Sequence, residues 1–257
     1  MLTDSHTHLN DAQFAADLPA VLTRARDAGV KRFIVPATSR NDWARTAELA
    51  APDILPAFGI HPWFAHTAQT DDFAVLHDYL AHHPQAAVGE IGLDYRMARN
   101  DAARQIQIGV LNRQLAIAAD LRRFVILHNV RASAALCAAL KPHAPLAGIV
   151  HAFSGSIEEA QAFIRAGLFI GIGSLLLNPA AKKVRAAAQQ LPLSSVVLET
   201  DSPFMLGTAR NEPANTAAVA AAFCRLRGIS PAALSAATEA NINRLWPPPA
   251  PHTGQAA

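Results

Sequence analysis

Eight short apolar runs alternate with stretches of helical periodicity along the chain, and this alternation constrains the fold more than any other feature of the sequence. The runs are apolar and rich in β-branched residues, which is typical of parallel strands covered on both faces. Alternating strands and helices favour a parallel sheet, and eight such units favour a closed (β/α)₈ TIM barrel, a single α/β domain. The expected strands span residues 2–5, 31–36, 54–60, 86–91, 124–127, 146–150, 168–172 and 195–199.

The segments between these runs repeat apolar residues at the spacing of a helix. The expected helices span residues 18–28, 43–51, 71–82, 102–120, 133–140, 157–166, 179–190, 213–227 and 231–246. A doubly wound open sheet is the alternative, but no Gly-x-Gly-x-x-Gly follows a strand, which weakens the case for a dinucleotide-binding fold. We expect the barrel to span residues 1–246 and the Pro-rich tail, 247–257, to be disordered.

Composition narrows the classes of function. Hydrophobic residues make up 51% of the chain and can fill a sizeable core, while a net charge of +2 does not suit a protein that coats nucleic acid by charge alone. Cys137 and Cys224 lie in Ala/Leu-rich helical surroundings and are expected to be thiols rather than a disulfide or a metal site. No apolar run has membrane-spanning length and no signal-peptide pattern occurs, so we expect a cytoplasmic protein with no membrane partner and favour a monomer.

Histidines and carboxylates follow six of the eight expected strands. In a barrel the carboxyl ends of the strands converge at one mouth, which is where active sites lie. A His-x-His pair alone is a weak signal, but a ring of seven such residues is difficult to obtain by chance. The ring consists of His6 and His8 after strand one, His61 after strand three, Glu90 at the end of strand four, His128 at the end of strand five, His151 after strand six and Asp201 after strand eight.

This mixture of imidazole and carboxylate suits Zn²⁺ or, with more oxygen ligands, Mn²⁺ or Mg²⁺. Six ligands exceed what one catalytic Zn²⁺ uses, so we expect two divalent ions about 3.5–4 Å apart. Glu90 is placed to bridge them, and Asp201 can bind one ion and act as general base toward a water. Taken singly, Glu90 could instead be a polar residue of the barrel interior, and Asp201 could cap a helix.

Five motifs resemble those of the TatD family of metal-dependent deoxyribonucleases, within the amidohydrolase superfamily. They are residues 4–9 (DSHTHL), 59–62 (GIHP), 89–95 (GEIGLDY), 150–155 (VHAFSG) and 198–203 (LETDSP). The YjjV-like branch is the most similar, through residues 34–38 (IVPAT) and 148–151 (GIVH). The resemblance runs from about residue 1 to residue 246, with the motifs in the family's order.

The resemblance implies a TIM barrel that holds two divalent metal ions (Zn²⁺, Mg²⁺ or Mn²⁺). One ion is expected on His6, His8, Glu90 and Asp201, and the other on Glu90, His128 and His151. The implied catalytic residues are Glu90 and Asp201, and the implied reaction is hydrolysis of DNA phosphodiesters, typically from the 3′ end, on single strands or DNA ends. Two alternatives stay open: hydrolysis of an ester or amide, such as an aminoacyl-tRNA ester, and a non-catalytic barrel that only binds a partner.

The sequence departs from the family after strand five, where the usual motif is His-x-Arg. Val130 occupies the usual Arg position and an arginine, Arg131, follows one residue later, which can turn the side chain to the other face. Trp63 and Tyr95 are candidates for stacking on bases, and Arg210 could bind a phosphate or be a solvated loop residue. The expected substrate-binding residues are therefore His61, Trp63, Tyr95, Arg131 and Arg210.

Overall fold

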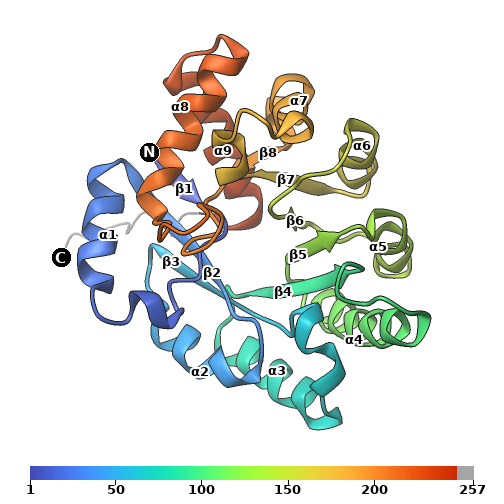
Figure 1. Cartoon of the computed structure of the whole chain (residues 1–257). Helices are drawn as coiled ribbons and strands as arrows, with labels where there is room; N and C mark the ends of the chain where they lie inside the picture. The colour runs from blue at the N-terminus through green and yellow to red at the C-terminus, as the bar shows by residue number, and fades with distance from the viewer. Residues whose placement is uncertain (248–257) are drawn as a thin grey trace, which may run out of the picture.

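The computed structural model describes residues 1–247, which form a barrel of eight parallel strands with helices around it (Figure 1). The strands pair in sequence order, and the Ser5 N–H donates to the Leu198 C=O (2.9 Å), which joins the first strand to the last. The predicted barrel is thus confirmed and the open sheet is wrong. The strands are β1 (Leu2–Asp4), β2 (Val30–Pro36), β3 (Ile54–Phe58), β4 (Ala87–Asp94), β5 (Val125–Val130), β6 (Gly148–Val150), β7 (Leu168–Ile172) and β8 (Val196–Leu198).

The helices follow the strands with bounds that differ from the predicted ones by a few residues. Capping explains one shift: Ser39 and Asp42 form a capping box, so the helix predicted from residue 43 begins at Arg40. Pro213–Asn215 forms a short 3-10 turn ahead of its helix. The helices are α1 (Leu18–Asp27), α2 (Arg40–Glu48), α3 (Thr70–His82), α4 (Asp101–Asp120), α5 (Ser133–Leu140), α6 (Ile157–Arg165), α7 (Lys182–Gln190), α8 (Thr216–Arg227) and α9 (Pro231–Leu245).

Two strands extend further than the sequence predicted, and this corrects the placement of two site residues. Glu90 and His128 were expected at strand ends, but both lie inside strands, because β4 and β5 stay paired from Ile91↔Leu127 to Asp94↔Val130. The register shifts between Val88 and Ile91, around Glu90. A bulge of this kind re-aims a side chain, so it sets the direction of Glu90 within a continuous strand.

The barrel interior is apolar at the end where the strands begin. Ile126 of β5, Ile149 of β6 and Val197 of β8 pack there together, and Ile242 and Trp246 from the region of α9 join the same cluster. Because side chains alternate along a strand, the residues two and four positions further along face inward as well. This alternation carries polar side chains to the other end of the interior.

Other predictions from the sequence have mixed outcomes. Both cysteines are free thiols, with Cys224 buried and Cys137 partly buried, as predicted. Within residues 1–247, no single helix is both long enough and apolar enough to cross a membrane. The predicted disorder of the tail falls outside the described residues, apart from Pro247.

Candidate metal centre

The ends of the first and last strands hold three of the predicted donors side by side. The Asp201 N–H donates to the His6 C=O (2.9 Å), and the His8 N–H donates to the Ser202 C=O (2.7 Å). Asp201 adopts a left-handed backbone, with φ of 56°, which aspartate tolerates better than most residues. His6, His8 and Asp201 therefore reach the mouth from one continuous hydrogen-bonded seam.

These three residues and Glu90 form one donor set. The Nε2 atoms of His6 and His8 lie 3.2 Å apart, and Asp201 Oδ1 lies 3.7 and 3.4 Å from them. Glu90 Oε2 lies 3.2 Å from His6 Nε2 and 3.6 Å from His8 Nε2. Ligands around a tetrahedral ion at about 2.1 Å lie about 3.4 Å apart, so His6, His8 and Glu90 fit one divalent ion, and Asp201 Oδ1 lies within 3.7 Å of both imidazoles.

The other oxygen of Glu90 faces a second donor set. Glu90 Oε1 lies 2.7 Å from His151 Nε2 and 2.9 Å from His128 Nδ1, and these two nitrogens are 3.2 Å apart. Glu90 is 2% exposed and offers one oxygen to each set. This is the arrangement that a carboxylate shared by two ions requires.

His61 lies beside the second set, but its ring is oriented as a hydrogen-bond donor. Its Nδ1 accepts the Trp63 backbone N–H (3.1 Å), and its Nε2 lies 3.2 Å from Glu90 Oε1. A ring nitrogen that accepts a hydrogen bond carries no proton, so neutral His61 carries its proton on Nε2. Burial lowers the pKa of His61, which favours this neutral form. His61 is therefore suited to donating a hydrogen bond to Glu90 or to a substrate oxygen.

The imidazoles of the first set differ in charge when no metal is bound. Burial, together with the neighbouring His151, lowers the pKa of His6 to about 4. Burial also opposes charge on His8, but Asp201 and Glu90 outweigh it and raise the pKa of His8 to about 9. The carboxylates thus hold a proton on His8 that a metal ion would have to displace.

In the second set, too, burial and neighbouring charges shift the pKa values in opposite directions. Burial disfavours a charged His128, yet Asp94 and Glu90 raise its pKa to about 9. Burial also disfavours an ionised Glu90, but His151, His61 and His6 hold its pKa well below the usual range. Glu90 is therefore an anion at neutral pH, which is the form that binds a metal.

Two exposed aromatic side chains stand on opposite sides of this centre. Trp63 is 46% exposed, and its ring centroid lies 5.0 Å from that of His61. Phe204 is 45% exposed, and its ring centroid lies 5.8 Å from that of His8. Tyr95 is only partly exposed and lies under the guanidinium of Arg104, at 4.8 Å. Trp63 and Phe204 are thus the aromatic rings best placed to meet a ligand.

The two arginines predicted to bind substrate lie in different surroundings. Arg131 is exposed, with a left-handed backbone (φ 56°), just beyond the end of β5. Arg210 donates to both carboxylate oxygens of Asp17 (2.8 Å each) and to Glu212 (2.8 Å). This pairing occupies the guanidinium of Arg210 and disfavours the phosphate-binding role predicted for it.

Reasoning from the sequence missed three buried carboxylates around the donors. Asp4 accepts from the backbone N–H of Thr200 (3.0 Å) and from its hydroxyl (2.6 Å), and burial raises the pKa of Asp4 to about 7. Asp94 Oδ2 accepts from Trp63 Nε1 (2.7 Å) and lies 3.4 Å from His128 Nε2. The sequence did contain a signal for these residues, because each of the three is a carboxylate within or next to an otherwise apolar run.

Glu199 is the third missed carboxylate, and it is fully buried. It lies two positions after Val197, so the alternation of β8 turns it inward. Its Oε1 accepts the Ala152 backbone N–H (2.5 Å). Burial, reinforced by repulsion from Asp201, raises the pKa of Glu199 well above its usual range. Cations bound nearby would favour its ionised form.

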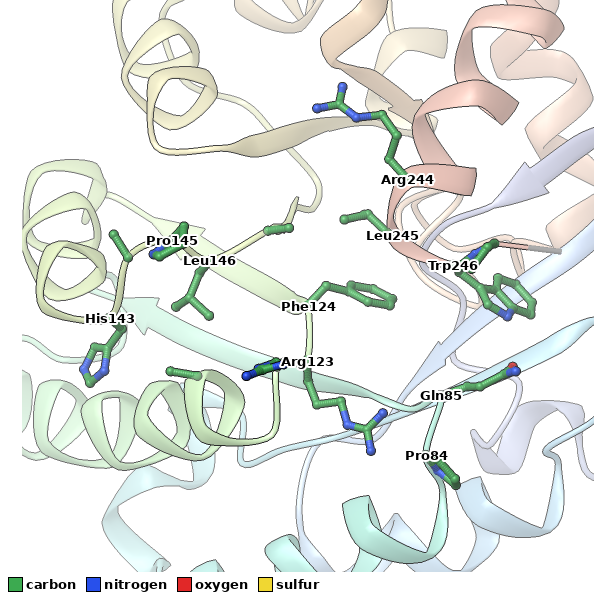
Figure 2. A pocket seen from close by; sticks show the side chains of 15 residues that line it. Pro84, Gln85, Arg123, Phe124, His143, Pro145, Leu146, Arg244, Leu245 and Trp246 are labelled. Atoms are coloured by element: carbon green, nitrogen blue, oxygen red, sulfur yellow. The ribbon is translucent and has the colours of Figure 1, made fainter. Parts of the chain in front are cut away.

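A pocket of about 760 Å³ lies at the opposite end of the barrel, near the beginning of β5 (Figure 2). Arg123, Phe124, Leu146 and Trp246 are among its lining residues, and none of the seven predicted donors lines it. The amino-terminal end of a barrel ordinarily serves stability, whereas chemistry takes place at the carboxyl end. The donor cluster is therefore the better candidate for the functional site.

Fold and site together define the class: a metal-dependent hydrolase built on a (β/α)₈ barrel. The family described as TatD related DNase matches residues 3–247, which is nearly the whole described chain. The chain belongs to this family, as its motifs predicted.

Individual relatives agree with this assignment. The chain is 37% identical to the uncharacterized metal-dependent hydrolase YjjV of Escherichia coli, over 87% of this chain and 89% of that protein. It is 33% identical to the 3′-5′ ssDNA/RNA exonuclease TatD of Edwardsiella piscicida, over 95% of this chain and 99% of that protein. The crystal structure of Escherichia coli YjjV superposes with a TM-score of 0.88 at 34% identity, covering 95% of this chain and 97% of that one.

Proposed function

We propose that this protein is a two-metal deoxyribonuclease that removes nucleotides from the 3′ ends of single-stranded DNA. The proposal rests on the position of the Glu90 carboxylate, which lies between two donor sets and offers one oxygen to each. The relatives named 3′-5′ ssDNA/RNA exonucleases support the same substrate class and polarity.

The first set, His6, His8, Glu90 and Asp201, would hold one divalent ion, and Glu90, His128 and His151 would hold the other. Bound there, two ions would activate a water and neutralise charge that develops on a phosphoryl group. Zn²⁺, Mn²⁺ and Mg²⁺ all suit sets of imidazole and carboxylate.

The chain's own residues supply proton transfer and orientation. The side chain of Asp201 is 14% exposed, against 3% for Glu90, so it is the carboxylate that a water at the mouth can reach. Asp201 is thus the candidate general base. His61 directs its Nε2 proton into the site and can donate to a non-bridging phosphate oxygen. Glu90, buried under five imidazoles, holds the donor sets together rather than moving a proton.

The exposed rings of Trp63 and Phe204 flank the centre and support a single-stranded substrate, because unpaired bases stack on aromatic side chains. In a duplex each base is stacked on its neighbours, and only the outer face of the last pair is free. We therefore propose a preference for single strands over blunt duplexes. The cytoplasmic location and the monomeric state expected from the sequence remain predictions.

The proposal is tested with single-stranded 20-mers labelled at either the 5′ or the 3′ end. Protein loaded separately with Mg²⁺, Mn²⁺ or Zn²⁺ should release a labelled mononucleotide first from the 3′-labelled strand and shorten the 5′-labelled strand stepwise. Glu90→Gln, purified in parallel, is the control for contaminating nuclease. Cleavage no faster than that of the control with every metal would overturn the proposal.

A second candidate is a metal-dependent hydrolase of carboxylic esters or amides, such as an aminoacyl-tRNA ester. The observation in its favour is Val130, which lacks charge at the position where the family usually carries an arginine. Activity on an ester or amide panel, on the same preparation and without release of nucleotides, would favour this candidate over the nuclease.

A further inference from the structure

Three buried polar atoms behind the donor sets have no hydrogen-bond partner among the described residues: His6 Nδ1, His151 Nδ1 and Glu199 Oε2. Unpaired buried polar atoms are rare and each requires an explanation. These three are neighbours, because one ligand-capable atom from each of His6, His151 and Glu199 lies within 4.8 Å of the other two. The Nε2 atoms of both rings face Glu90, so the Nδ1 atoms are the ones left for Glu199.

The barrel is shaped to hold the Glu199 carboxylate at this place. A Cβ added to Gly171 would lie 2.4 Å from Glu199 Oε2, and one added to Gly173 would lie 3.0 Å from Glu199 Oε1. Any larger residue at Gly171 would thus occupy the space of the carboxylate. On its other side, Glu199 Oε1 accepts the Ala152 N–H (2.5 Å), next to His151. Two glycines and one backbone N–H therefore fix Glu199 behind the two rings.

We propose that Glu199 is a positioning residue that sets the tautomers of His6 and His151. A histidine that binds a metal through Nε2 needs its proton on Nδ1, and metal-ligating histidines almost always donate that N–H to an acceptor. Glu199 Oε2 is the unpaired acceptor behind both rings. The inference rests on the proposed metal centre, but it concerns proton positions that can be measured without metal.

The spacing suits one water shared by the three atoms. None of them makes a direct hydrogen bond to another, although one ligand-capable atom of each of the three residues lies within 4.8 Å of the others. Three atoms at about 2.8 Å from a single water lie up to about 4.8 Å apart. Such a water accepts one N–H from each ring with its two lone pairs and donates one O–H to Glu199 Oε2. The three unpaired atoms of His6, His151 and Glu199 then each have a partner.

The substitution Glu199→Gln keeps the shape of the side chain but changes the balance of hydrogen-bond donors and acceptors around the water. If the amide oxygen keeps the bond to the Ala152 N–H, the amide nitrogen faces the water, which then meets three donors with two lone pairs. If the amide flips, two N–H groups oppose each other at Ala152. In the first case one ring no longer has an acceptor for a proton on Nδ1 and can carry it on Nε2, where it blocks a metal. In the second case the side chain loses the Ala152 contact that fixes it behind the rings.

The experiment compares wild type, Glu199→Gln and Glu239→Gln. Glu239 is a matched control: it is also a buried carboxylate with one unpaired oxygen, but it bonds to Thr3 and lies away from the donor sets. Zinc affinity, measured by competition with a chelator, should fall about 10- to 100-fold in Glu199→Gln and stay within about twofold in Glu239→Gln. Circular dichroism should show both variants folded.

Nuclear magnetic resonance of ¹⁵N-labelled imidazoles reads the tautomers directly in the metal-free protein, at a pH that ionises Glu199. Wild type should show Nδ1–H signals for both His6 and His151, and Glu199→Gln should lose at least one of them. His8, whose Nδ1 lies 3.2 Å from the Pro36 C=O, provides a signal that should persist in both. Wild-type tautomers in Glu199→Gln, or Nε2–H tautomers in wild type, would overturn the inference.

The two proposals can fail separately. A wild type that binds zinc but cleaves no DNA contradicts the deoxyribonuclease and leaves the role of Glu199 intact. As a second variant, Gly171→Ala should displace the carboxylate and weaken zinc binding without any change at Glu199. Gly109→Ala is its control, because a Cβ there meets nothing within 4 Å. Unchanged zinc binding in Gly171→Ala, in a folded protein, would also contradict the inference.

Discussion

The imidazole rings of His6 and His151 are stacked, with centroids 3.8 Å apart and planes 9° from parallel, although they come from the first and sixth strands. Two charged rings at this distance would repel each other strongly. The low pKa of His6 follows from burial and from this neighbour. The stack therefore favours an uncharged His6, the form that metal binding requires, whereas His8 and His128 hold protons that must leave.

Metal affinity should rise with pH. The pKa values of His8 and His128, both about 9, imply that binding at neutral pH releases about two protons. Each ion displaces one of these protons, so the zinc affinity of each site should rise about tenfold per pH unit between pH 6 and 8. Competition titrations with a chelator of known pH dependence measure the slope, and calorimetry in two buffers counts the protons. A flat profile would contradict the charge assignment.

The stability of the metal-free protein should fall as the pH rises. The folded-state pKa of His8 is raised, so its pairing with Asp201 stabilises the fold fully below about pH 6.5, the ordinary pKa of histidine. That contribution is lost as the pH rises through about 9. Thermal unfolding in the presence of a chelator should show a falling Tm between pH 7 and 9.5, and His8→Asn should flatten the curve.

Trp63→Ala should raise KM for single-stranded DNA roughly tenfold, because loss of a stacked base costs about 1–3 kcal/mol. Trp63→Phe should have a smaller effect, since it keeps an aromatic face and loses only the bond to Asp94. Phe64→Ala is the control, because Phe64 is the next residue and is 39% exposed. Steady-state kinetics on an oligonucleotide measures all three, and equal effects of Trp63→Ala and Phe64→Ala would argue against stacking.

Arg210→Gln should lower Tm by a few degrees and leave KM within about twofold. The guanidinium joins Asp17 near α1 to Glu212 in the segment after β8, so its loss weakens a surface network of ion pairs. Differential scanning calorimetry and kinetics on one preparation separate the effects. A large rise in KM with unchanged Tm would instead restore the phosphate-binding role.

Arg131→Ala should weaken substrate binding in a salt-dependent way. Arg131 is exposed beyond β5, on the strand that carries His128. If it contacts one phosphate of a single strand, the slope of log KM against log salt should decrease by about 0.7. Arg225→Ala on α8, another exposed arginine, is the comparison and should leave the slope unchanged. An unaltered slope in Arg131→Ala would show that the displaced arginine has no phosphate contact.

Gly109→Ala should stabilise the protein by about 0.5–1 kcal/mol, because an exposed glycine inside a helix is entropically unfavourable. Position 109 lies within α4 and a Cβ there meets nothing within 4 Å. Gly92→Ala should do the reverse, since φ is 143° and the new Cβ would lie 2.0 Å from the His128 C=O. Urea unfolding at fixed pH measures both, and stabilisation by both substitutions would contradict the geometry.

Periodicity and strand ends predicted the barrel and the ring of donors, because parallel strands bring distant residues to one rim whatever their loops do. The bulge around Glu90 could not be predicted, since it depends on how β4 pairs with β5. The pairing of Arg210 with Asp17 depends on two segments from opposite ends of the chain, and no local pattern reveals it. The inward position of Glu199 could have been predicted from the sequence, because side chains alternate along β8.

The side chains of Ile242 and Trp246 fill the amino-terminal end of the barrel interior, together with Ile126 and Val197. The donor cluster is therefore closed off on that side, and a substrate can reach it only from the mouth at the carboxyl ends of the strands. A polymer cannot be threaded through such a site, and a strand whose two ends are both far away can enter it only as a tight bend. A free terminus enters without bending, so the plugged floor supports the proposed digestion from an extremity.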